Sequence, residues 1–488
     1  MTTCTRRELL AAAGLLAGCR QMQAPESAQD AVRRYLTRIG EVDRLLHAVI
    51  EVNPDAMHIA TELDDERRAG KSRGPLHGWP ILIKDNIDTA DRMLTTAGSL
   101  ALVGAPTPKQ DAGVVTRLRA AGAVIIGKTN LSEWANIRSS RSTSGWSGRG
   151  GQTCNPHALD RNPSGSSSGS GAAVAASLCM AAVGTETDGS IVSPSANNGI
   201  VGIKPTVGLL SGRGIIPISH SQDTAGPMTR TVRDAAAMLS AMNGRGIDFS
   251  GALQDGALRG ARLGVARGFF GGHPGVRRVI EESIAALRKA GAELIDPIEL
   301  PPDREYGDAE FEVMMYELKH GLNAYLAERG GVIRSLADVI AFNEREAARE
   351  MPYFGQENLI KAEAKGPLTD KAYLDAREKS KRAAAGGIDA AMDKHGLTAI
   401  IAPTDGLAWL TDYVNGDHFM QSCATPAAVA GYPHITVPAG FVTGLPVGLS
   451  FFGRADSEAK LIGVAHDFER LTQARRAPRL IAHAADRV

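Results

Sequence analysis

The 488-residue chain has 43% hydrophobic and 22% charged residues, which is the composition of an ordinary globular protein. Lys plus Arg and Asp plus Glu each number 54, so the formal net charge is zero and nothing favours a nucleic-acid partner. The length suffices for one large α/β domain or for two domains of ordinary size.

The cysteines are widely spaced and form neither a Cys-x-x-Cys motif nor an array with histidines. They are Cys4, Cys19, Cys154, Cys179 and Cys423. This spacing supports neither a zinc site nor a disulfide scaffold, and we expect no metal and no cofactor. The last three cysteines are interpreted as buried or unpaired thiols.

Residues 1–19 are predicted to be an export signal. Thr5-Arg6-Arg7-Glu8-Leu9-Leu10 resembles a twin-arginine signal, and the apolar run that follows is too short to span a bilayer, which needs about 20 residues. Leu16-Ala17-Gly18-Cys19 resembles a bacterial lipobox. We expect a periplasmic protein anchored through a lipid on Cys19, and Arg20 after that cysteine favours the outer membrane. The alternative is an ordinary amphipathic helix.

The first half of the remaining chain alternates predicted helices and strands. Apolar residues at three- and four-residue steps predict a helix over residues 27–50. Residues 79–83 predict a buried strand with Lys84 at its end, and residues 112–121 predict a helix before a strand at 124–126. The Gly- and Ser-rich segment 139–170 has the composition of a linker or flexible loop, although an Ala-rich helix is predicted directly after it, over 171–183.

The second half predicts strands at 263–266, 399–402, 434–438 and 447–452, with helices at 275–290 and from Asp456. Residues 305–395 are mostly helical and charged in pattern, which indicates a covering lobe. Neither an internal repeat nor a linker between domains is evident. The pattern therefore predicts one α/β domain over residues 20–488.

Two Gly/Ser clusters, at 162–171 and 184–191, flank the predicted Ala-rich helix. Their spacing matches neither a P-loop nor a dinucleotide-binding motif, so phosphate binding is disfavoured. Acyl transfer fits better, because Gly189 next to Ser190 lets backbone N–H groups converge on an oxyanion. A G-x-S-x-G motif is absent around Ser190, which argues against an α/β-hydrolase. No histidine lies in either cluster, and we interpret His77, His157 and His220 as structural.

These clusters, together with Ile83-Lys84-Asp85-Asn86, resemble the amidase signature family over about residues 28–474. The resemblance implies a mixed central β-sheet covered by helices on both faces, and a Ser–cis-Ser–Lys triad. In that triad Ser190 is the nucleophile, Ser166 behind a cis peptide is the proton shuttle, and Lys84 is the terminal base. The separation 190 − 166 = 24 matches the family spacing. Lys84 must be neutral at rest, which burial beside residues 79–83 favours.

The resemblance also assigns the oxyanion hole to the backbone N–H groups of Thr187, Asp188, Gly189 and Ser190. Many members have glycine in place of Asp188, so this chain departs from the common pattern. Val192 and Ser193 stand where relatives that bind a carboxylate often have an arginine, which favours a neutral, larger amide.

Within the family, residues 129–136, 144–147 and 184–192 are most similar to bacterial peptide amidases, which release ammonia from C-terminal carboxamides of peptides. Three alternatives remain open. A glutamine-hydrolysing subunit of a tRNA-dependent amidotransferase conflicts with an export signal, and a non-catalytic lipoprotein that binds ligands conflicts with the presence of all three triad residues. An esterase would use the same machinery.

Overall fold

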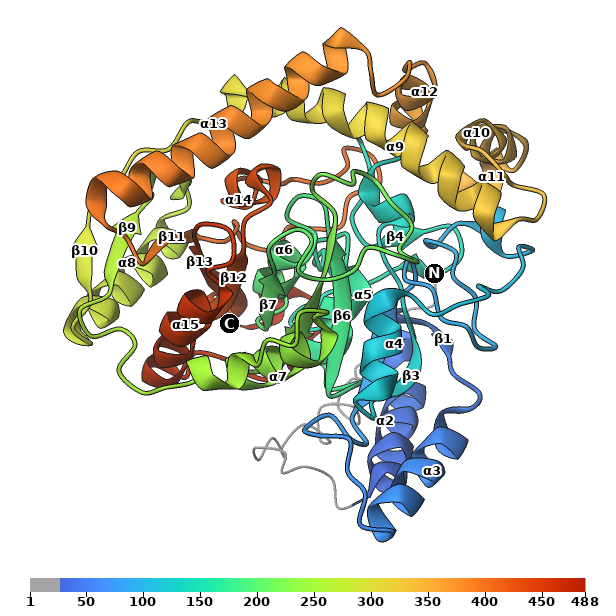
Figure 1. The fold of residues 1–488 in the computed structure, drawn as a ribbon, viewed down its shortest axis with the longest axis horizontal. Coiled ribbons are helices and arrows are strands. Elements are labelled where there is room, and N and C mark those ends of the chain that lie inside the picture. Colours follow the sequence, from blue (N-terminus) through green and yellow to red (C-terminus); the bar gives the residue numbers. More distant parts are fainter. Residues whose placement is uncertain (1–26, 488) are drawn as a thin grey trace.

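The computed structural model describes residues 27–487, so the predicted export signal, with Arg6, Arg7 and Cys19, lies outside the described residues. One mixed sheet of 11 strands forms the centre of the molecule (Figure 1). Its order is β1 (Val49–Val52), β3 (Val124–Thr129), β2 (Pro80–Lys84), β6 (Ala181–Glu186), β8 (Thr224–Thr229), β7 (Val201–Lys204), β12 (His434–Val442), β13 (Leu445–Phe452), β11 (Ala399–Pro403), β9 (Arg262–Val265) and β10 (Glu293–Ile295).

The central strands are buried along their whole length, because helices flank the sheet and neither face of these strands is exposed to solvent. β2 pairs in parallel with β3 and β6, and β9 pairs in parallel with β10 and β11, whereas the remaining neighbours are antiparallel. The flanking helices are α2 (Ala28–Val42), α3 (Ala56–Arg68), α4 (Gly113–Ala120), α5 (Ser168–Ala175), α6 (Val192–Asn197), α7 (Val232–Met242), α8 (Pro274–Lys289), α14 (Thr425–Ala430) and α15 (Glu458–Thr472). The predicted single α/β domain with a mixed central sheet is confirmed.

The predicted covering lobe at 305–395 is helical throughout most of its length. It consists of α9 (Gly307–Arg329), α10 (Leu336–Arg345), α11 (Ala347–Glu350), α12 (Glu357–Glu363) and α13 (Lys371–His395). The two long helices α9 and α13 arch over the edge of the sheet in Figure 1. No helix within residues 27–487 combines the length and the apolar character needed to cross a membrane.

A buried charged group ties this lobe to the rest of the molecule. Arg138 has no exposed surface and pairs with Glu133, and it also donates to the backbone oxygen of Glu350 in α11. The Glu350 carboxylate in turn accepts hydrogen bonds from the hydroxyl of Ser99 and the N–H of Leu100. Because isolated buried charges are costly, these contacts fix the lobe on the core.

Two predicted helices are wrong in extent. The pattern over 27–50 continues past the end of α2 at Val42, and Val49 already belongs to strand β1. The Ala-rich run over 171–183 is divided, because α5 ends at Ala175 and β6 begins at Ala181. Buried helices and buried strands are both apolar on all sides, so periodicity does not separate them.

The segment 139–170 is not a flexible linker, because most of it is buried. Its side chains satisfy the polar backbone groups of the surrounding loops. The amide of Asn155 donates to the oxygen of Asn197 at 2.9 Å, and the amide of Asn162 donates to the oxygen of Ser144 at 2.9 Å. The polar side chains of this segment form internal hydrogen bonds. Composition alone does not distinguish such buried polar side chains from polar side chains exposed to solvent.

Candidate active site

The topology of β2, α5 and β6 brings the predicted triad residues to one edge of the sheet. β2 and β6 are parallel neighbours, with Ile83 opposite Val183, so their carboxyl ends lie together. Lys84 is the last residue of β2, and Ser190 follows β6 by four residues. Helix α5 leads the chain back to the start of β6, so Ser166, just before α5, lies at this same edge.

The three side chains form a continuous line of contacts. The Nζ of Lys84 lies 2.8 Å from the Oγ of Ser166, which lies 2.9 Å from the Oγ of Ser190. The peptide bond between Gly165 and Ser166 is cis, as the resemblance implied. Lys84 is fully buried, and Ser190 retains 9% exposure, the largest of the three. Ser190 is therefore the member of the line that a substrate reaches first.

Lys84 is surrounded by neutral oxygen atoms. Besides Ser166, its Nζ contacts the Oγ of Ser167 at 3.0 Å and both the hydroxyl and the backbone oxygen of Thr185, at 2.9 and 3.2 Å. Burial lowers the pKa of Lys84 from 10.5 to about 7, against the weaker opposing influence of Glu186 and Asp223. An uncharged amine is thus available near neutral pH.

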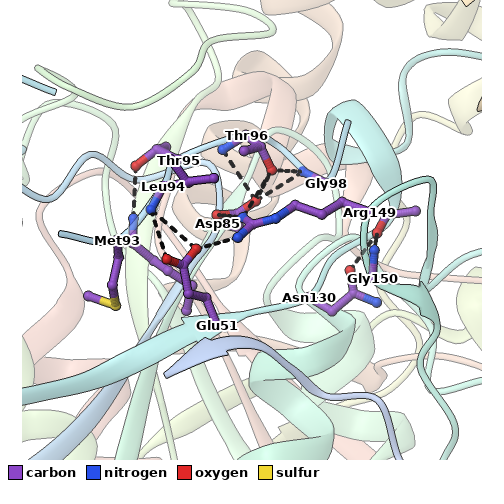
Figure 2. Close-up of polar contacts among 12 residues, drawn as sticks. Glu51, Asp85, Met93, Leu94, Thr95, Thr96, Gly98, Asn130, Arg149 and Gly150 are labelled. Carbon is purple, nitrogen blue, oxygen red and sulfur yellow. Dashed lines mark hydrogen bonds and ion pairs between the residues drawn. The ribbon is translucent and has the colours of Figure 1, made fainter. Parts of the chain in front are cut away.

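The residue after Lys84 fixes the end of β2. The carboxylate of Asp85 accepts the N–H groups of Thr96 and Gly98 at 3.2 and 3.1 Å, and the hydroxyl of Thr96 as well. Figure 2 shows the side chain of Arg149 reaching both Asp85 and Glu51. This network holds the backbone on which Lys84 stands.

The loop after β6 presents backbone donors beside the nucleophile. Within residues 27–487, the N–H groups of Thr187, Asp188 and Ser190 donate to no other group, whereas the N–H of Gly189 faces the Glu186 carboxylate. Gly189 has a φ of 74°, a conformation that favours glycine. Three of the four predicted oxyanion-hole N–H groups therefore have no hydrogen-bond partner among the described residues.

Glu186 also organises the chain beyond Ser190. Its carboxylate accepts the N–H groups of Ile191 and Val192 at 2.7 and 3.0 Å. These donors stand at the start of α6, where an anion is stabilised by the unpaired N–H groups of the helix terminus. The side chain of Ser193 contacts the Oγ of Ser164 at 2.6 Å, so it joins α6 to the cluster that holds Ser166.

Buried carboxyl groups gather next to the oxyanion loop. Thr425 donates to the carboxylate of Asp188 at 2.8 Å, and Gln222 bridges the backbone oxygen of Thr187 to Glu310 at 3.3 and 2.9 Å. Burial raises the pKa of Asp188 to about 7, and burial together with Asp188 raises that of Glu310. The surroundings are unfavourable for a substrate carboxylate.

The remaining predicted residues lie away from this line. His77 and His157 are buried with a ring nitrogen beside a backbone oxygen, and His220 is half exposed beside Glu317, which confirms the structural interpretation. Cys154, Cys179 and Cys423 are unpaired, as predicted. Across the part of the chain that the structure describes, no cluster of His, Cys, Asp or Glu is arranged to hold a metal ion.

Sequence reasoning missed three neighbours of Lys84, namely Asn86, Ser167 and Thr185. The amide of Asn86 contacts the hydroxyl of Thr185 at 3.0 Å, and Ser167 contacts the backbone oxygen of Thr185 at 3.0 Å. All three stand inside the motifs that carried the resemblance. The sequence signal that could have identified them is the presence of hydroxyl and amide side chains close to the predicted triad residues within these motifs.

Comparison with known proteins agrees with this geometry. The sequence model of the Amidase family matches residues 30–462. An Arabidopsis thaliana protein named "Probable amidase At4g34880" is 41% identical over 476 residues, covering 92% of this chain and 88% of its own length. A glutamyl-tRNA(Gln) amidotransferase component from Symbiobacterium thermophilum is 35% identical over 470 residues, covering 92% of this chain and 94% of its own length.

Among solved structures, native peptide amidase from Stenotrophomonas maltophilia is 50% identical, with a TM-score of 0.89 and coverage of 93% of this chain and 95% of that one. The family match thus covers nearly the whole described domain, and the fold is shared over the same length. On these grounds the chain belongs to the Amidase family and is an enzyme that hydrolyses amides.

Proposed function

We propose that this protein is a serine amidase that hydrolyses the C-terminal carboxamide of peptides and releases ammonia. The observation that carries the proposal is the line of contacts from the buried amine of Lys84 through Ser166 to Ser190, at 2.8 and 2.9 Å. A nucleophilic serine needs a base within such reach, and an amine with a pKa of about 7 serves as one near neutral pH.

In the proposed first step, the Oγ of Ser190 bonds to the carboxamide carbon and the carbonyl electron pair moves to oxygen. The Ser190 proton passes to the Oγ of Ser166, whose own proton passes to the amine of Lys84. The oxyanion accepts hydrogen bonds from the N–H groups of Thr187, Asp188 and Ser190. When the C–N bond breaks, the proton returns through Ser166 to the departing nitrogen, which leaves as ammonia.

In the second step, water attacks the acyl ester on Ser190. Its proton passes to the Oγ of Ser166, whose own proton passes to Lys84, and the ester C–O bond breaks to give the carboxylic acid. Lys84 then returns the proton through Ser166 to the oxygen of Ser190. Each catalytic cycle consumes one water and releases one ammonia, so the relay ends as it began.

A peptide amide is supported over a small carboxylate-bearing amide by the charges around the site. Asp188 and Glu310 cannot neutralise a substrate carboxylate, and Val192 and Ser193 offer no cation to pair with one. The 50% identity to a peptide amidase, against 35% to the amidotransferase component, supports the same choice.

The segment that borders the site also suits a longer substrate. Ala424 stands next to Gly189, and Asn162 donates to the backbone oxygen of Trp409 at 2.7 Å, so residues 409–424 run from the shuttle cluster to the oxyanion loop. This stretch exposes apolar side chains at its surface, among them Val414, Phe419 and Met420. Such a surface suits a peptide chain better than free glutamine.

The proposal includes export by the twin-arginine route and attachment to the outer membrane through Cys19, facing the periplasm. Its support is the order of twin arginines, apolar run and Leu-Ala-Gly-Cys in the sequence.

Ammonia release from a panel of blocked dipeptide amides, free glutamine, free asparagine and aryl amides tests the function. We expect turnover of the dipeptide amides and a loss on the order of 10⁴-fold in Ser190→Ala, because the nucleophile and its relay act as one unit. Ser166→Ala should lose at least about 10²-fold. Normal ammonia release by a correctly folded Ser190→Ala enzyme contradicts the proposal.

A further inference from the structure

The hydroxyl of Thr185 competes with that of Ser166 for the amine of Lys84. A neutral amine has two hydrogens and one lone pair, and the relay requires the lone pair to face Ser166. The hydroxyl of Ser167 is already committed, because it donates to the backbone oxygen of Thr185 at 3.0 Å. The hydroxyl of Thr185, 2.9 Å from Nζ, is therefore the rival donor.

The destination of the Thr185 proton depends on Asn86. Among the described residues, the hydroxyl oxygen of Thr185 contacts the Nζ of Lys84 and, at 3.0 Å, the amide nitrogen of Asn86, which donates to it in the structure. If Asn86 presents its NH₂ group, the Thr185 hydroxyl has only Lys84 as an acceptor, and the lone pair is occupied. If Asn86 presents its oxygen, that oxygen takes the Thr185 proton, and the lone pair is left for Ser166.

Nothing else within residues 27–487 fixes the amide of Asn86. The side chain is 2% exposed, and its amide oxygen, which points away from Thr185, has no hydrogen-bond partner there. Asn86 also lines a small pocket with Trp134, whose ring nitrogen is likewise buried without a partner, and with apolar side chains of the loop at Ile216 and of helix α9. A half-turn of the amide, which exchanges its nitrogen and its oxygen, loses no contact on that side and gives the Thr185 proton an acceptor.

We infer that Asn86 is a positioning residue that acts through the Thr185 hydroxyl and, with its amide oxygen turned toward Thr185, sets the direction of the proton relay by keeping the lone pair of Lys84 free for Ser166. The inference rests on the proposed Ser190–Ser166–Lys84 chemistry. It predicts that the loss of activity caused by a substitution at Asn86 is partly restored when the Thr185 hydroxyl is also removed. A role in packing alone predicts that the second change adds to the damage.

The test is a double-mutant cycle on the full-length enzyme, with kcat/KM for a blocked dipeptide amide measured across pH. Asn86→Leu keeps the size and removes the acceptor, and should lose about 10²-fold at the pH optimum, the scale of general acid–base catalysis. Thr185→Val should lose less than about tenfold, because Ser167 and the Thr185 backbone oxygen still accept both amine hydrogens. The double variant should match Thr185→Val, a recovery of about tenfold or more over Asn86→Leu.

Asn86→Leu/Thr185→Ser is the matched control, since it restores a competing hydroxyl and should stay as impaired as Asn86→Leu. If Asn86→Leu fails to fold, as judged by its thermal unfolding, Asn86→Ala takes its place in the same cycle. Full activity of the Asn86 single variant, or a double variant no better than it, overturns the inference. Lys84→Ala, measured in parallel, separates this failure from that of the proposed function, because activity in that variant would remove the relay itself.

Discussion

The amine of Lys84 lies 2.8 Å from the hydroxyl oxygen of Ser166, in a position with no exposure to solvent. Burial holds its pKa at about 7, whereas a lysine in water has a pKa of 10.5. The protonated form cannot accept a proton from Ser166. We therefore expect kcat/KM to rise with pH through about 7, and the free enzyme's pH profile for a dipeptide amide measures this directly.

Asp188 provides the control for that profile, because burial raises the pKa of its carboxyl to about 7 as well. Asp188→Asn removes this carboxyl and leaves the backbone N–H in place. If the rise of kcat/KM through about pH 7 is caused by deprotonation of Lys84, the same rise should remain in this variant. Loss of this rise in the variant would assign it to Asp188 instead.

The same lysine should lower the stability of the protein. Its pKa is about 7 folded and 10.5 unfolded, so the unfolded chain binds more protons between these values and the free energy of unfolding rises with pH there. The difference of 3.5 between the two pKa values corresponds to roughly 5 kcal/mol of folding stability. Below pH 7 the protein lacks all of this stability. Lys84→Met should be more stable than wild type, with a margin that is largest near pH 6.5 and shrinks toward pH 10.

Chemical denaturation at both pH values measures that margin. Lys109→Met is the matched control, since Lys109 is exposed and its replacement should change stability little at either pH. A margin for Lys84→Met that is absent, or that grows with pH, would contradict the expected sign.

Substrate preference follows from the carboxyl groups beside the oxyanion loop. A blocked dipeptide amide should have a kcat/KM at least hundreds-fold above that of free glutamine, because an unpaired buried carboxylate costs several kcal/mol. Ammonia release from the two substrates under the same conditions gives the ratio. Equal efficiency would point to a glutaminase and leave the serine relay intact.

Membrane attachment should depend on Cys19, and export on Arg6 and Arg7. Cys19→Ser is expected to move the enzyme from the membrane to the soluble fraction, because the lipid would have no site of attachment. Cys4→Ser is the matched control and should stay membrane-bound. A Cys19→Ser protein that remains firmly in the membrane would rule out the lipid anchor without touching the enzyme chemistry.

The sequence identified the α/β class, the covering lobe and the three residues of the line because local motifs carry them. Ser166 and Ser190 stand in two Gly/Ser clusters, and Lys84 ends an apolar run that only a buried strand accommodates. The helix-to-strand step at Ala175 to Ala181 was missed because burial removes periodicity from both elements. Asn86 and Thr185 lie 99 positions apart and meet only through the parallel pairing of β2 with β6, which no local pattern contains.

The contacts of Arg138 with Glu133 and Glu350 have a consequence for engineering. The lobe contributes Glu310 beside the oxyanion loop, so exchanging the whole lobe between relatives is an obvious way to attempt a change of specificity. Here, exchange would remove the Glu350 backbone oxygen from the Arg138 guanidinium, which would keep its pairing with Glu133. It would also leave the Ser99 hydroxyl and the Leu100 N–H without an acceptor. Changes of substrate range in this scaffold therefore have to be made by single side chains, with the anchor of α11 left intact.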